Sequence, residues 1–372
     1  MKRPIRVAYV SHFDHYRMGG QQSMLALIEN LDRERFIPMV ICPGPGELSE
    51  RLKALDCPAY FVELGPIKPK HIYKFFKNIS AIKRILKYDK IDIIHPDHER
   101  DALVCGLAQR NLQAKMVWHL RLTRPNNLDK INSSFADKII GISEGTRRRV
   151  PENQSDKFVK IYNGVDCDKF RPTDRTGIRQ KLGLPPTRFI ITFVGQITPG
   201  KGVFDLLSAA KIMKGRLEDD RLPLMLFIGT ERDEETMQLF CDRIRSFGIG
   251  DVVRHIPQQT NIHEWMQASE ALTLPSHEGV EGMGRVIFEA MATGATAVGT
   301  DISGVREAIS QETGFLVPEQ SPDRLATAFM KLINDPALLD SMQHSARRRA
   351  CETFDIKKHA REVERVYLNL IQ

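Results

Sequence analysis

IRVAYVSHFDHYRMGGQQSMLALIENL, residues 5–31, has the pattern of a buried strand, a glycine-containing loop and an amphipathic helix. IRVAYVS is mostly apolar, MGGQQ supplies the loop, and SMLALIENL carries apolar residues at helical spacing. The alternation continues to residue 143, with further strand-like runs at IPMVIC, AYFVEL, IDIIH, AKMVWHL and DKIIGIS. Alternating strands and helices are typical of a doubly wound parallel sheet, so these six strands predict one complete Rossmann-like unit.

A second α/β unit follows a stretch rich in charge, proline and glycine, residues 165–188, which is typical of an interdomain connection. Its expected strands are RFIITFVG, LPLMLFIG, DVVRHI, ALTLPS, ATAVGT and GFLVPE, with helical segments between them. We therefore expect an N-terminal domain at 1–170, a second domain at 171–354 and a C-terminal helix at 355–372. The apolar stripe of that helix needs a packing partner, and the N-terminal domain is one option.

The composition is that of a folded globular protein. Of the 372 residues, 42% are hydrophobic and 27% are charged, which excludes a disordered or collagen-like chain. No apolar run approaches the ~20 residues that cross a bilayer, and the start turns polar too early for a signal peptide, so we expect a cytoplasmic protein. The six cysteines show no CxxC or metal-like spacing, and we expect neither disulfides nor structural zinc.

Positive charge is concentrated in the first half of the chain. Residues 1–170 contain 29 Lys and Arg against 20 Asp and Glu, whereas residues 171–372 contain 25 against 27. Most of the excess lies in residues 68–90, where eight cations face only Asp89. This segment is either a basic amphipathic helix that lies on anionic lipid or a helix that packs on the sheet with solvated lysines. Its apolar residues at helical spacing are Ile72, Phe75, Phe76, Ile79, Ile82, Ile85 and Leu86.

The loop after the first strand argues against one common class of Rossmann-like enzyme. HFDHYRMGGQQ is not the GxGxxG pattern that binds a dinucleotide, and no acidic residue closes the second strand. A nicotinamide-dependent dehydrogenase is therefore disfavoured. The two units still predict ligand sites, because ligands of open parallel sheets bind beyond the carboxyl ends of the strands.

The most informative stretch is LPSHEGVEGMGRVIFEAMATGATAVGTDISGVREAI, residues 274–309. Glu281 and Glu289 are separated by seven residues, and the turn between them leads into a helix that starts near Arg285. A helix N-terminus offers unpaired N–H groups and a positive dipole end, which suit a phosphate or a sugar hydroxyl. The two carboxylates can accept hydrogen bonds from sugar hydroxyls.

This stretch resembles the retaining nucleotide-sugar glycosyltransferases of family 4, the group 1 transferases with the GT-B fold, and the resemblance extends over essentially the whole chain. PSHEG before the turn and EAMATG after it match as well. The resemblance implies an α/β protein of two Rossmann-like doubly wound domains that face each other across a cleft. It also implies that Glu281 lies toward the transferred sugar and Glu289 toward the nucleotide ribose.

FVGQITPGKG, residues 193–202, matches the strand, loop and helix start that carry an arginine and a lysine for the donor diphosphate in this family. Lys201 matches the lysine. Gln196 occupies the arginine position, and glutamine supplies neither a charge nor the bidentate guanidinium fork. We expect that Arg285 or another nearby cation compensates for the missing charge.

Three landmarks of the first half also match the family in order. Gly19 and Gly20 match a glycine pair that lets backbone amides approach the donor phosphate. His119, at the end of AKMVWHL, matches a histidine that points into the cleft near the transferred sugar. NGVD, residues 163–166, matches a turn before the domain connection, which we interpret as a hinge.

HPDHERD, residues 95–101, has metal-like composition but no second ligand cluster in the sequence, so we expect no metal site there. His98 or Arg100 can still contact the acceptor or the donor. In GT-B transferases, protein cations and helix ends generally stabilise the leaving diphosphate. The resemblance therefore implies no cofactor and no metal, the nucleotide sugar being a substrate.

The reaction that the resemblance implies is transfer of a hexose or N-acetylhexosamine from a UDP- or GDP-linked donor to a glycan or lipid-linked acceptor, with retention of configuration. It belongs to the synthesis of bacterial cell-surface polysaccharide, lipopolysaccharide or glycolipid. The implied catalytic residues are His119 and Glu281. The implied donor-binding residues are Gly19, Gly20, Gly195, Gln196, Lys201, Gly282, Met283, Gly284, Arg285, Val286 and Glu289.

Two other functions remain as alternatives. A GT-B nucleotide-sugar 2-epimerase would use the same cleft without an acceptor, and the Glu-x7-Glu block disfavours it. A non-enzymatic nucleic-acid-binding module would use the basic half, but no nucleic-acid motif is present and we expect no such partner. The expected location is the cytoplasm, with peripheral attachment to the inner face of the cytoplasmic membrane if residues 68–90 contact anionic lipid.

Overall fold

The structure is a computed structural model that describes residues 3–65 and 72–371. The chain forms two compact units, each of which is considered by itself. The first comprises Met1–Gly164 and Ile356–Gln372, and the second comprises Val165–Asp355. These divisions follow Gly164 and Asp355, whereas the expected ones follow residues 170 and 354.

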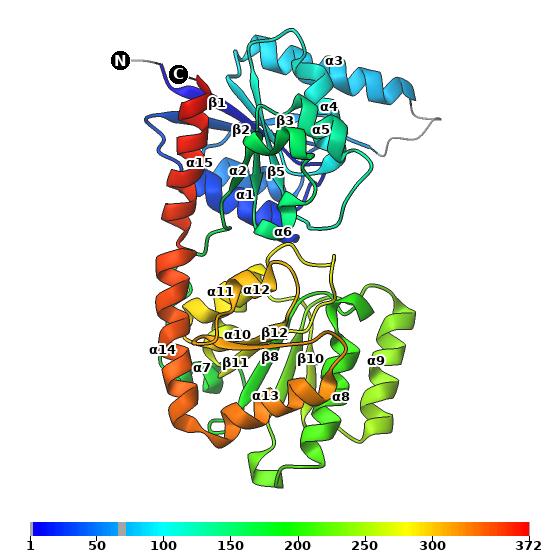
Figure 1. Cartoon of the computed structure of the whole chain (residues 1–372), viewed down its shortest axis with the longest axis vertical. Helices are drawn as coiled ribbons and strands as arrows, with labels where there is room; N and C mark the ends of the chain where they lie inside the picture. The colour runs from blue at the N-terminus through cyan, green and yellow to red at the C-terminus, as the bar shows by residue number, and fades with distance from the viewer. Residues whose placement is uncertain (1–2, 66–71, 372) are drawn as a thin grey trace. The chain divides into compact units, whose positions relative to one another are not determined.

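A seven-stranded parallel sheet forms the centre of the first unit, in the order β3-β2-β1-β4-β5-β6-β7. Figure 1 labels β1, β2, β3 and β5 of this sheet. Six of its strands coincide with the predicted runs. The seventh, β7, is missing from the prediction because a strand of three residues is too short to show a periodicity. The strands are β1 (Ile5–Val10), β2 (Phe36–Cys42), β3 (Ala59–Phe61), β4 (Ile93–Pro96), β5 (Lys115–Leu120), β6 (Lys138–Gly141) and β7 (Phe158–Lys160).

Alternate residues of a strand point to opposite faces of the sheet. In this sheet both faces are apolar and are covered by helices. Val7 and Tyr9 of β1 belong to one buried cluster, and Ala8 and Val10 to another. The predicted glycine loop is wrong in one detail: Gly19 is the first residue of α1, so the glycine pair begins the helix. The helices are α1 (Gly19–Glu29), α2 (Glu47–Ala54), α3 (Ile72–Tyr88), α4 (Glu99–Gln109), α5 (Asp129–Phe135), α6 (Glu144–Arg147) and the 3₁₀ helix η2 (Glu152–Lys157).

The C-terminal helix α15 (Ile356–Ile371) belongs to the first unit. Val363 and Tyr367 are fully buried in the same cluster as Val7 and Tyr9 of β1. The apolar stripe of DIKKHAREVERVYLNLI therefore packs on the face of the sheet that carries Val7 and Tyr9.

A six-stranded parallel sheet forms the centre of the second unit, in the order β10-β9-β8-β11-β12-β13. All six strands lie within the predicted runs. The fold class is thus confirmed as α/β with two doubly wound parallel sheets. The strands are β8 (Ile190–Val194), β9 (Leu224–Ile228), β10 (Val253–Ile256), β11 (Ala271–Leu274), β12 (Thr296–Thr300) and β13 (Gly314–Val317).

One long helix of the second unit, α14, is absent from the prediction. Its sequence PALLDSMQHSARRRACET is largely polar, and only Met342, Ala346 and Ala350 are buried. The helices are α7 (Arg175–Lys181), α8 (Val203–Lys214), α9 (Glu234–Phe247), α10 (Ile262–Gln267), α11 (Arg285–Ala292), α12 (Val305–Ala308), α13 (Pro322–Asn334) and α14 (Pro336–Thr353), with 3₁₀ helices η3 (Pro199–Lys201) and η4 (Asp219–Arg221).

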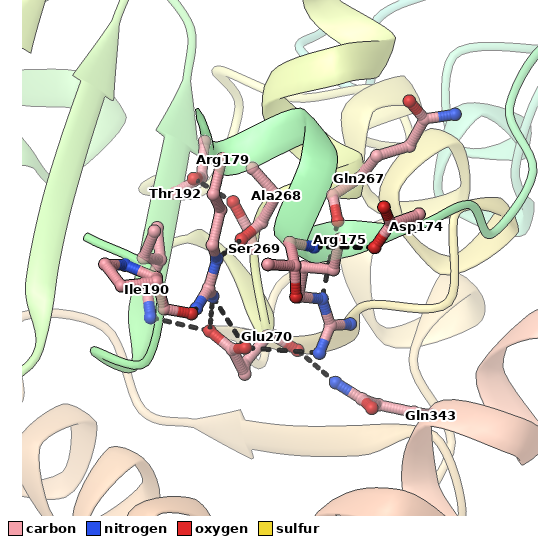
Figure 2. A network of polar contacts seen from close by, with 12 residues as sticks. Asp174, Arg175, Arg179, Ile190, Thr192, Gln267, Ala268, Ser269, Glu270 and Gln343 are labelled. Atoms are coloured by element: carbon pink, nitrogen blue, oxygen red, sulfur yellow. Dashed lines mark hydrogen bonds and ion pairs between the residues drawn. The ribbon is translucent and has the colours of Figure 1, made fainter. Parts of the chain in front are cut away.

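A buried polar network closes the amino end of the second sheet, where Glu270 precedes β11 (Figure 2). Arg179 Nη2 lies 2.7 and 2.6 Å from the two carboxylate oxygens of Glu270, and Arg175 Nη1 lies 3.1 Å from Oε1. The Ile190 N–H donates to Oε2 at 2.7 Å, and Gln343 donates to the Glu270 carbonyl at 2.9 Å. These contacts join α7, β8, β11 and α14 in one structural unit.

Two further features bear on the sequence predictions. Among the residues that the structure describes, no helix combines the length and the apolar composition that a membrane crossing requires. All six cysteines lie within the described ranges as free thiols, and the Sγ atoms of Cys167 and Cys351 are 2.7 Å apart.

Candidate functional site

Two loops of the second unit meet beyond the carboxyl ends of β8 and β11, the neighbouring strands at which the order of the sheet reverses. The first loop spans residues 195–202 and the second spans residues 275–284. The His277 N–H donates to the Gly200 carbonyl at 2.9 Å and so joins the two loops. Doubly wound sheets bind ligands at this reversal, so the topology favours a site here.

Glycines allow these loops to come close together. Gly202 has φ +69°, and a Cβ at this position would lie 1.9 Å from the Pro275 carbonyl oxygen. Gly284 has φ +71°, and a Cβ there would lie 2.5 Å from Leu274 Cδ2. A side chain at either position would strain the backbone. At Gly202 it would also push the two loops apart, and at Gly284 it would collide with Leu274 at the end of β11.

Lys201 and Glu281 form an ion pair between the two loops through Lys201 Nζ and Glu281 Oε1. Ser276 Oγ donates to the same carboxylate oxygen at 3.2 Å. The side chains of Lys201 and Glu281 are 22% and 13% exposed, so the ion pair is largely buried but still accessible to solvent. A partly desolvated ammonium of this kind can neutralise a phosphate, whereas the carboxylate can accept hydrogen bonds from hydroxyl groups.

Glu289 lies one turn into α11 and is 4% exposed. Arg285 Nη2 is 2.6 Å from Glu289 Oε1, which directs the guanidinium along the helix toward this carboxylate. Gln196 is exposed after β8 and supplies no charge there. Since Arg285 is engaged with Glu289, the structure gives no support to the expectation that it replaces the arginine missing at Gln196.

The N-terminus of α11 has no side-chain cap, because its N-cap residue is Gly284. Uncapped N–H groups at the positive end of a helix dipole favour an anion. Gly282 and Met283 are buried beside this end, and Val286 is half-buried in the first turn. The turn and the helix start therefore place backbone amides beyond the carboxyl end of β11.

Gly195 and Gln196 follow β8 directly, where two loops are in close contact. The Gly195 N–H donates to the Ile228 carbonyl at 3.0 Å. A Cβ on Gly229 would lie 1.9 Å from the Gly195 carbonyl oxygen, so this contact between the loops after β8 and β9 requires a glycine.

Two residues that the sequence prediction missed also fix the second loop. His277 Nε2 lies 2.9 Å from Asp205 Oδ2, in the first turn of α8. The Glu278 carboxylate accepts from the Ser303 N–H at 3.0 Å, just before α12. PSHEG contains both His277 and Glu278, but their partners are distant in sequence and carry no signal of the pairing.

In the first unit, the order of the sheet reverses between β1 and β4. Gly20 lies at this point: a Cβ on it would lie 3.4 Å from both Arg121 Cδ and Asp97 Oδ2. Arg121 Nε donates to Asp97 at 3.0 Å, and Arg121 Nη1 donates to Asn163 Oδ1 at 3.2 Å. Gly19 is exposed at the start of α1. The glycine pair thus lies beside a cation, Arg121, that the sequence prediction missed.

His119 is fully buried in β5, whose carboxyl end it approaches. His119 Nδ1 lies 3.1 Å from His95 Nε2, and His119 Nε2 has no hydrogen-bond partner among the described residues. Burial, together with the nearby Arg121 guanidinium, holds the pKa of His119 well below its usual value. His119 is therefore a neutral imidazole at neutral pH.

A second titratable cluster lies at the same edge of the first sheet. His12, His98 and Asp101 place one ligand atom each within 4.8 Å of one another, and His12 Nδ1 lies 2.8 Å from Asp101 Oδ2. His98 Nδ1 also accepts from the Arg100 N–H at 3.3 Å. HPDHERD thus finds a third partner in His12, which the sequence prediction missed because His12 follows a different strand. Two imidazoles and a carboxylate are a donor set that could hold a divalent transition metal.

The fold resembles solved transferase structures over nearly its full length. A glycosyltransferase from Rickettsia africae has a TM-score of 0.87 at 21% identity, with 99% of each chain covered. Anabaena Alr3699/HepE, solved in complex with UDP and glucose, has a TM-score of 0.83 at 17% identity, with 97% of this chain and 99% of that chain covered. The fold is therefore GT-B.

Two sequence families match consecutive parts of the chain. Residues 18–169 match Glycosyltransferase Family 4, and residues 174–349 match Glycosyl transferases group 1. A D-inositol 3-phosphate glycosyltransferase from Thermobispora bispora is 30% identical over 82% of this chain and 76% of its own length. The chain therefore belongs to the group 1 glycosyltransferases of family 4, as the sequence motifs predict.

Other relatives differ in the length that they share. D-inositol 3-phosphate glycosyltransferase 2 from Catenulispora acidiphila is 32% identical over 53% of this chain. This chain spans 51% of that relative and 48% of a Streptomyces avermitilis enzyme of the same kind, about half the length of each. A UDP-Gal:alpha-D-GlcNAc-diphosphoundecaprenol alpha-1,3-galactosyltransferase from Escherichia coli is 24% identical over 95% of this chain and 94% of its own length.

Proposed function

We propose that this protein transfers a hexose or N-acetylhexosamine from a UDP- or GDP-linked donor to a hydroxyl group of a glycan or lipid-linked acceptor, with retention of the anomeric configuration. The observation that carries the proposal is the Lys201–Glu281 pair, held beside the uncapped N-terminus of α11 where the order of the second sheet reverses. A cation, the amides of a helix N-terminus and a carboxylate together suit a diphosphate that is linked to a sugar.

The second unit supplies most of the donor site in this proposal. Lys201 and the first-turn amides of α11, next to Gly284, bind the diphosphate. Glu281 accepts hydrogen bonds from hydroxyls of the transferred sugar, and Glu289 accepts them from the ribose. The remaining residues of the proposed donor site in this unit are Gly195, Gln196, Gly282, Met283, Arg285 and Val286.

Three residues of the first unit, Gly19, Gly20 and His119, are also proposed to bind the donor. The amides at Gly19 and Gly20 approach the diphosphate, and His119 contacts the transferred sugar. Its neutral imidazole is suited to hydrogen bonding rather than to charge stabilisation. The protein's contribution to the reaction is orientation of the reactants and stabilisation of the developing phosphate charge.

Retention follows in this proposal from attack on the same face of the sugar that the diphosphate leaves. The acceptor oxygen bonds to the anomeric carbon as the bond to the diphosphate oxygen breaks, and the departing phosphate takes the acceptor proton. No metal is required, because Lys201 and the amides of α11 supply the positive charge. EDTA is therefore expected to leave turnover unchanged, and a loss that Mn²⁺ restores would contradict this part of the proposal.

The acceptor is proposed to be lipid-linked or acidic, and the protein to act on the inner face of the cytoplasmic membrane in cell-surface glycan synthesis. The name of the Escherichia coli relative, which includes a diphosphoundecaprenol, supports a lipid-linked acceptor. In α3, Ile82 and Leu86 are buried, whereas Tyr73 and Phe76 are 79% and 59% exposed among lysines. The helix thus packs on the sheet and also presents aromatic and basic groups that suit anionic lipid. Lys68 and Lys70 lie outside the described residues.

Co-sedimentation with vesicles tests the membrane contact. The parent protein is expected to bind vesicles that contain anionic lipid at low salt, and Tyr73→Ser/Phe76→Ser is expected to bind several-fold less. Neutral phosphatidylcholine vesicles are the control. Absence of binding of the parent protein to anionic vesicles at low salt would contradict the membrane contact.

A panel of nucleotide sugars tests the proposed reaction. One donor is expected to raise the melting temperature and to be hydrolysed slowly, and the same donor with a glycan acceptor should give a product with the donor's anomeric configuration. An inverted product would contradict retention. Release of the epimerised sugar without an acceptor would identify a 2-epimerase instead, and no response to any donor would contradict the assignment.

A further inference from the structure

Four buried polar side chains form a continuous hydrogen-bonded chain in the first unit. Tyr9 Oη in β1 lies 3.0 Å from Tyr367 Oη in α15, and Tyr367 Oη is hydrogen-bonded to His95 Nδ1 in β4. His95 Nε2 lies 3.1 Å from His119 Nδ1 in β5. All four residues are at most 2% exposed. This series of hydrogen bonds therefore begins at Tyr9 and ends at His119 Nε2, which has no hydrogen-bond partner among the described residues.

Each of the four groups carries one proton that it can donate. Burial raises the pKa of both tyrosines above the usual phenol value, and burial lowers the pKa of both histidines well below the usual imidazole value. At neutral pH the phenols are therefore protonated and the imidazoles are neutral, with one N–H each. The number of protons is therefore fixed, and what remains to be determined is which group donates in each of the three hydrogen bonds.

Three proton arrangements keep all three hydrogen bonds, because the Tyr367 hydroxyl oxygen can accept one hydrogen bond or two. In the first, Tyr9 donates to Tyr367, Tyr367 donates to His95 Nδ1, and His95 Nε2–H donates to His119 Nδ1, so that His119 carries its proton on Nε2. In the second, every bond is reversed, and His119 Nδ1–H donates to His95. In the third, Tyr9 and His95 Nδ1–H both donate to Tyr367, and His119 Nδ1–H again donates to His95, so the Tyr367 hydroxyl proton has no acceptor among the described residues. The second arrangement leaves the Tyr9 hydroxyl proton without an acceptor, because Tyr367 is the only hydrogen-bond partner of Tyr9 among the described residues.

The first arrangement leaves fewer unmet groups. It leaves one buried group unpaired, the His119 Nε2–H. The second arrangement leaves the Tyr9 O–H and the His119 Nε2 lone pair unpaired, and the third leaves the Tyr367 O–H and the same lone pair unpaired. A buried unpaired donor or acceptor costs about 1–3 kcal/mol. His359, the nearest other imidazole, has its ring 6.3 Å from that of His119 and directs Nδ1 to the Tyr162 carbonyl at 2.6 Å. His359 therefore offers no alternative partner.

We infer that Tyr9, Tyr367 and His95 are positioning residues that hold His119 as the Nε2–H tautomer, which makes His119 a hydrogen-bond donor to an oxygen atom of the bound substrate. This inference rests on the proposed function for the identity of the substrate. It also gives the C-terminal helix a positioning role, because Tyr367 on α15 donates to His95 Nδ1 and so fixes the proton of His95 on Nε2.

The test measures the tautomer of His119 in the ligand-free protein by ¹⁵N NMR after labelling of the histidines, with the signals assigned by their loss in His119→Gln and His95→Gln. The parent protein should show a proton on His119 Nε2. Tyr9→Phe should keep this tautomer, since Tyr367 then has only His95 as acceptor. Tyr367→Phe should mix the two tautomers, because it removes the donor that defines His95. A proton on Nδ1 in the parent, or a switch in Tyr9→Phe, would overturn the inference.

Activity gives a second, independent readout. With a donor that the parent enzyme uses, Tyr367→Phe is expected to lower kcat about tenfold at a temperature well below its melting transition, where the variant stays folded although the unpaired Tyr9 hydroxyl lowers its stability. A mixed tautomer with parental kcat would show that the substrate does not use this N–H, and would overturn the role toward substrate. The tautomer measurement needs no substrate, so its failure is distinct from a failure of the proposed function.

Discussion

Glu270 at the amino end of the second sheet and Glu281 beyond its carboxyl end are both shielded carboxylates that pair with cations, but their surroundings differ. Glu270 is held by Arg179, Arg175 and the Ile190 N–H, which belong to regular elements that pack together. Glu281 is held by Lys201 and Ser276, which belong to loops. The first carboxylate has its partners in rigid structure, and the second has a cation on a flexible stem.

Because of this difference, we expect Glu270 to stabilise the second unit and Glu281 to bind a ligand. At Glu270 the guanidinium groups and the backbone amide satisfy the hydrogen-bonding needs of the buried carboxylate. The network therefore joins four elements and is not expected to bind a ligand. At Glu281 we propose that the lysine that neutralises the carboxylate turns toward a phosphate, and that the carboxylate accepts hydrogen bonds from sugar hydroxyls. We therefore expect substitutions at the two ends to affect different measurements.

Glu270→Ala should have the largest effect, a loss of about 3–5 kcal/mol in the stability of the second unit, because it leaves Arg179 buried without its counter-charge. The two tryptophans, Trp118 and Trp265, lie one in each unit, so urea unfolding followed by Trp265 fluorescence in a Trp118→Phe background reports the second unit. Asp242→Ala, which removes an exposed pair with Arg245 from the same unit, is the control and should leave the midpoint unchanged. A parental midpoint for Glu270→Ala would mean that the network is not a stabilising one.

Lys201→Ala should lower kcat/KM about 100-fold, or about 2.7 kcal/mol, because the diphosphate loses its cation. The urea midpoint of the second unit should move far less than in Glu270→Ala. Steady-state kinetics with the preferred donor measure the effect, and Lys214→Ala, which removes a lysine paired with Asp251 on the surface of the same unit, is the matched control. Equal kcat/KM for the two variants would contradict the role of Lys201.

Gly284→Ala should destabilise the second unit by about 1–3 kcal/mol, because it combines a left-handed backbone with a contact to Leu274. Gly183→Ala is the matched control: Gly183 has φ +63°, but a Cβ added there would have no atom within 4 Å. Urea unfolding of both variants separates the backbone strain from the contact. If Gly183→Ala lowers the stability of the second unit as much as Gly284→Ala does, the contact with Leu274 contributes nothing to the loss of stability.

Gln196→Arg should have the smallest effect, a gain in donor affinity of at most about tenfold, because a guanidinium would add the charge and the paired donors that glutamine lacks. Calorimetric titration with the preferred nucleotide sugar measures this change, with Gln259→Arg on another exposed loop of the same unit as control. An unchanged affinity in Gln196→Arg would show that the site is not short of a cation at this point.

Much of the fold could be predicted from the sequence, because buried parallel strands are short apolar runs with clear limits. RFIITFVG and LPLMLFIG needed no tertiary information. Two elements escaped prediction for local reasons: FVK of β7 is too short for a pattern, and α14 buries only three small or flexible side chains. The start of α1 at Gly19 was missed because glycine usually interrupts helices, and here the helix begins with a pair of them.

The sequence predicted less of the candidate site. Glu281, Lys201 and the turn before α11 could be predicted because the residues of each motif are consecutive. The pairing of His277 with Asp205, the His12–Asp101 contact and the chain from Tyr9 to His119 could not, because each joins residues from different strands and helices. Only the packing of the elements brings these partners together.

The central claim is that the carboxyl end of the second sheet binds the nucleotide of the donor, and calorimetric titration of the nucleoside diphosphate against the parent, Glu289→Gln and Asp242→Ala tests it most directly. Glu289→Gln keeps the shape of the side chain but removes the charge that pairs with Arg285 and is proposed to bind the ribose. We predict binding at least tenfold weaker for Glu289→Gln and parental binding for Asp242→Ala. Equal affinity for all three proteins would contradict the claim.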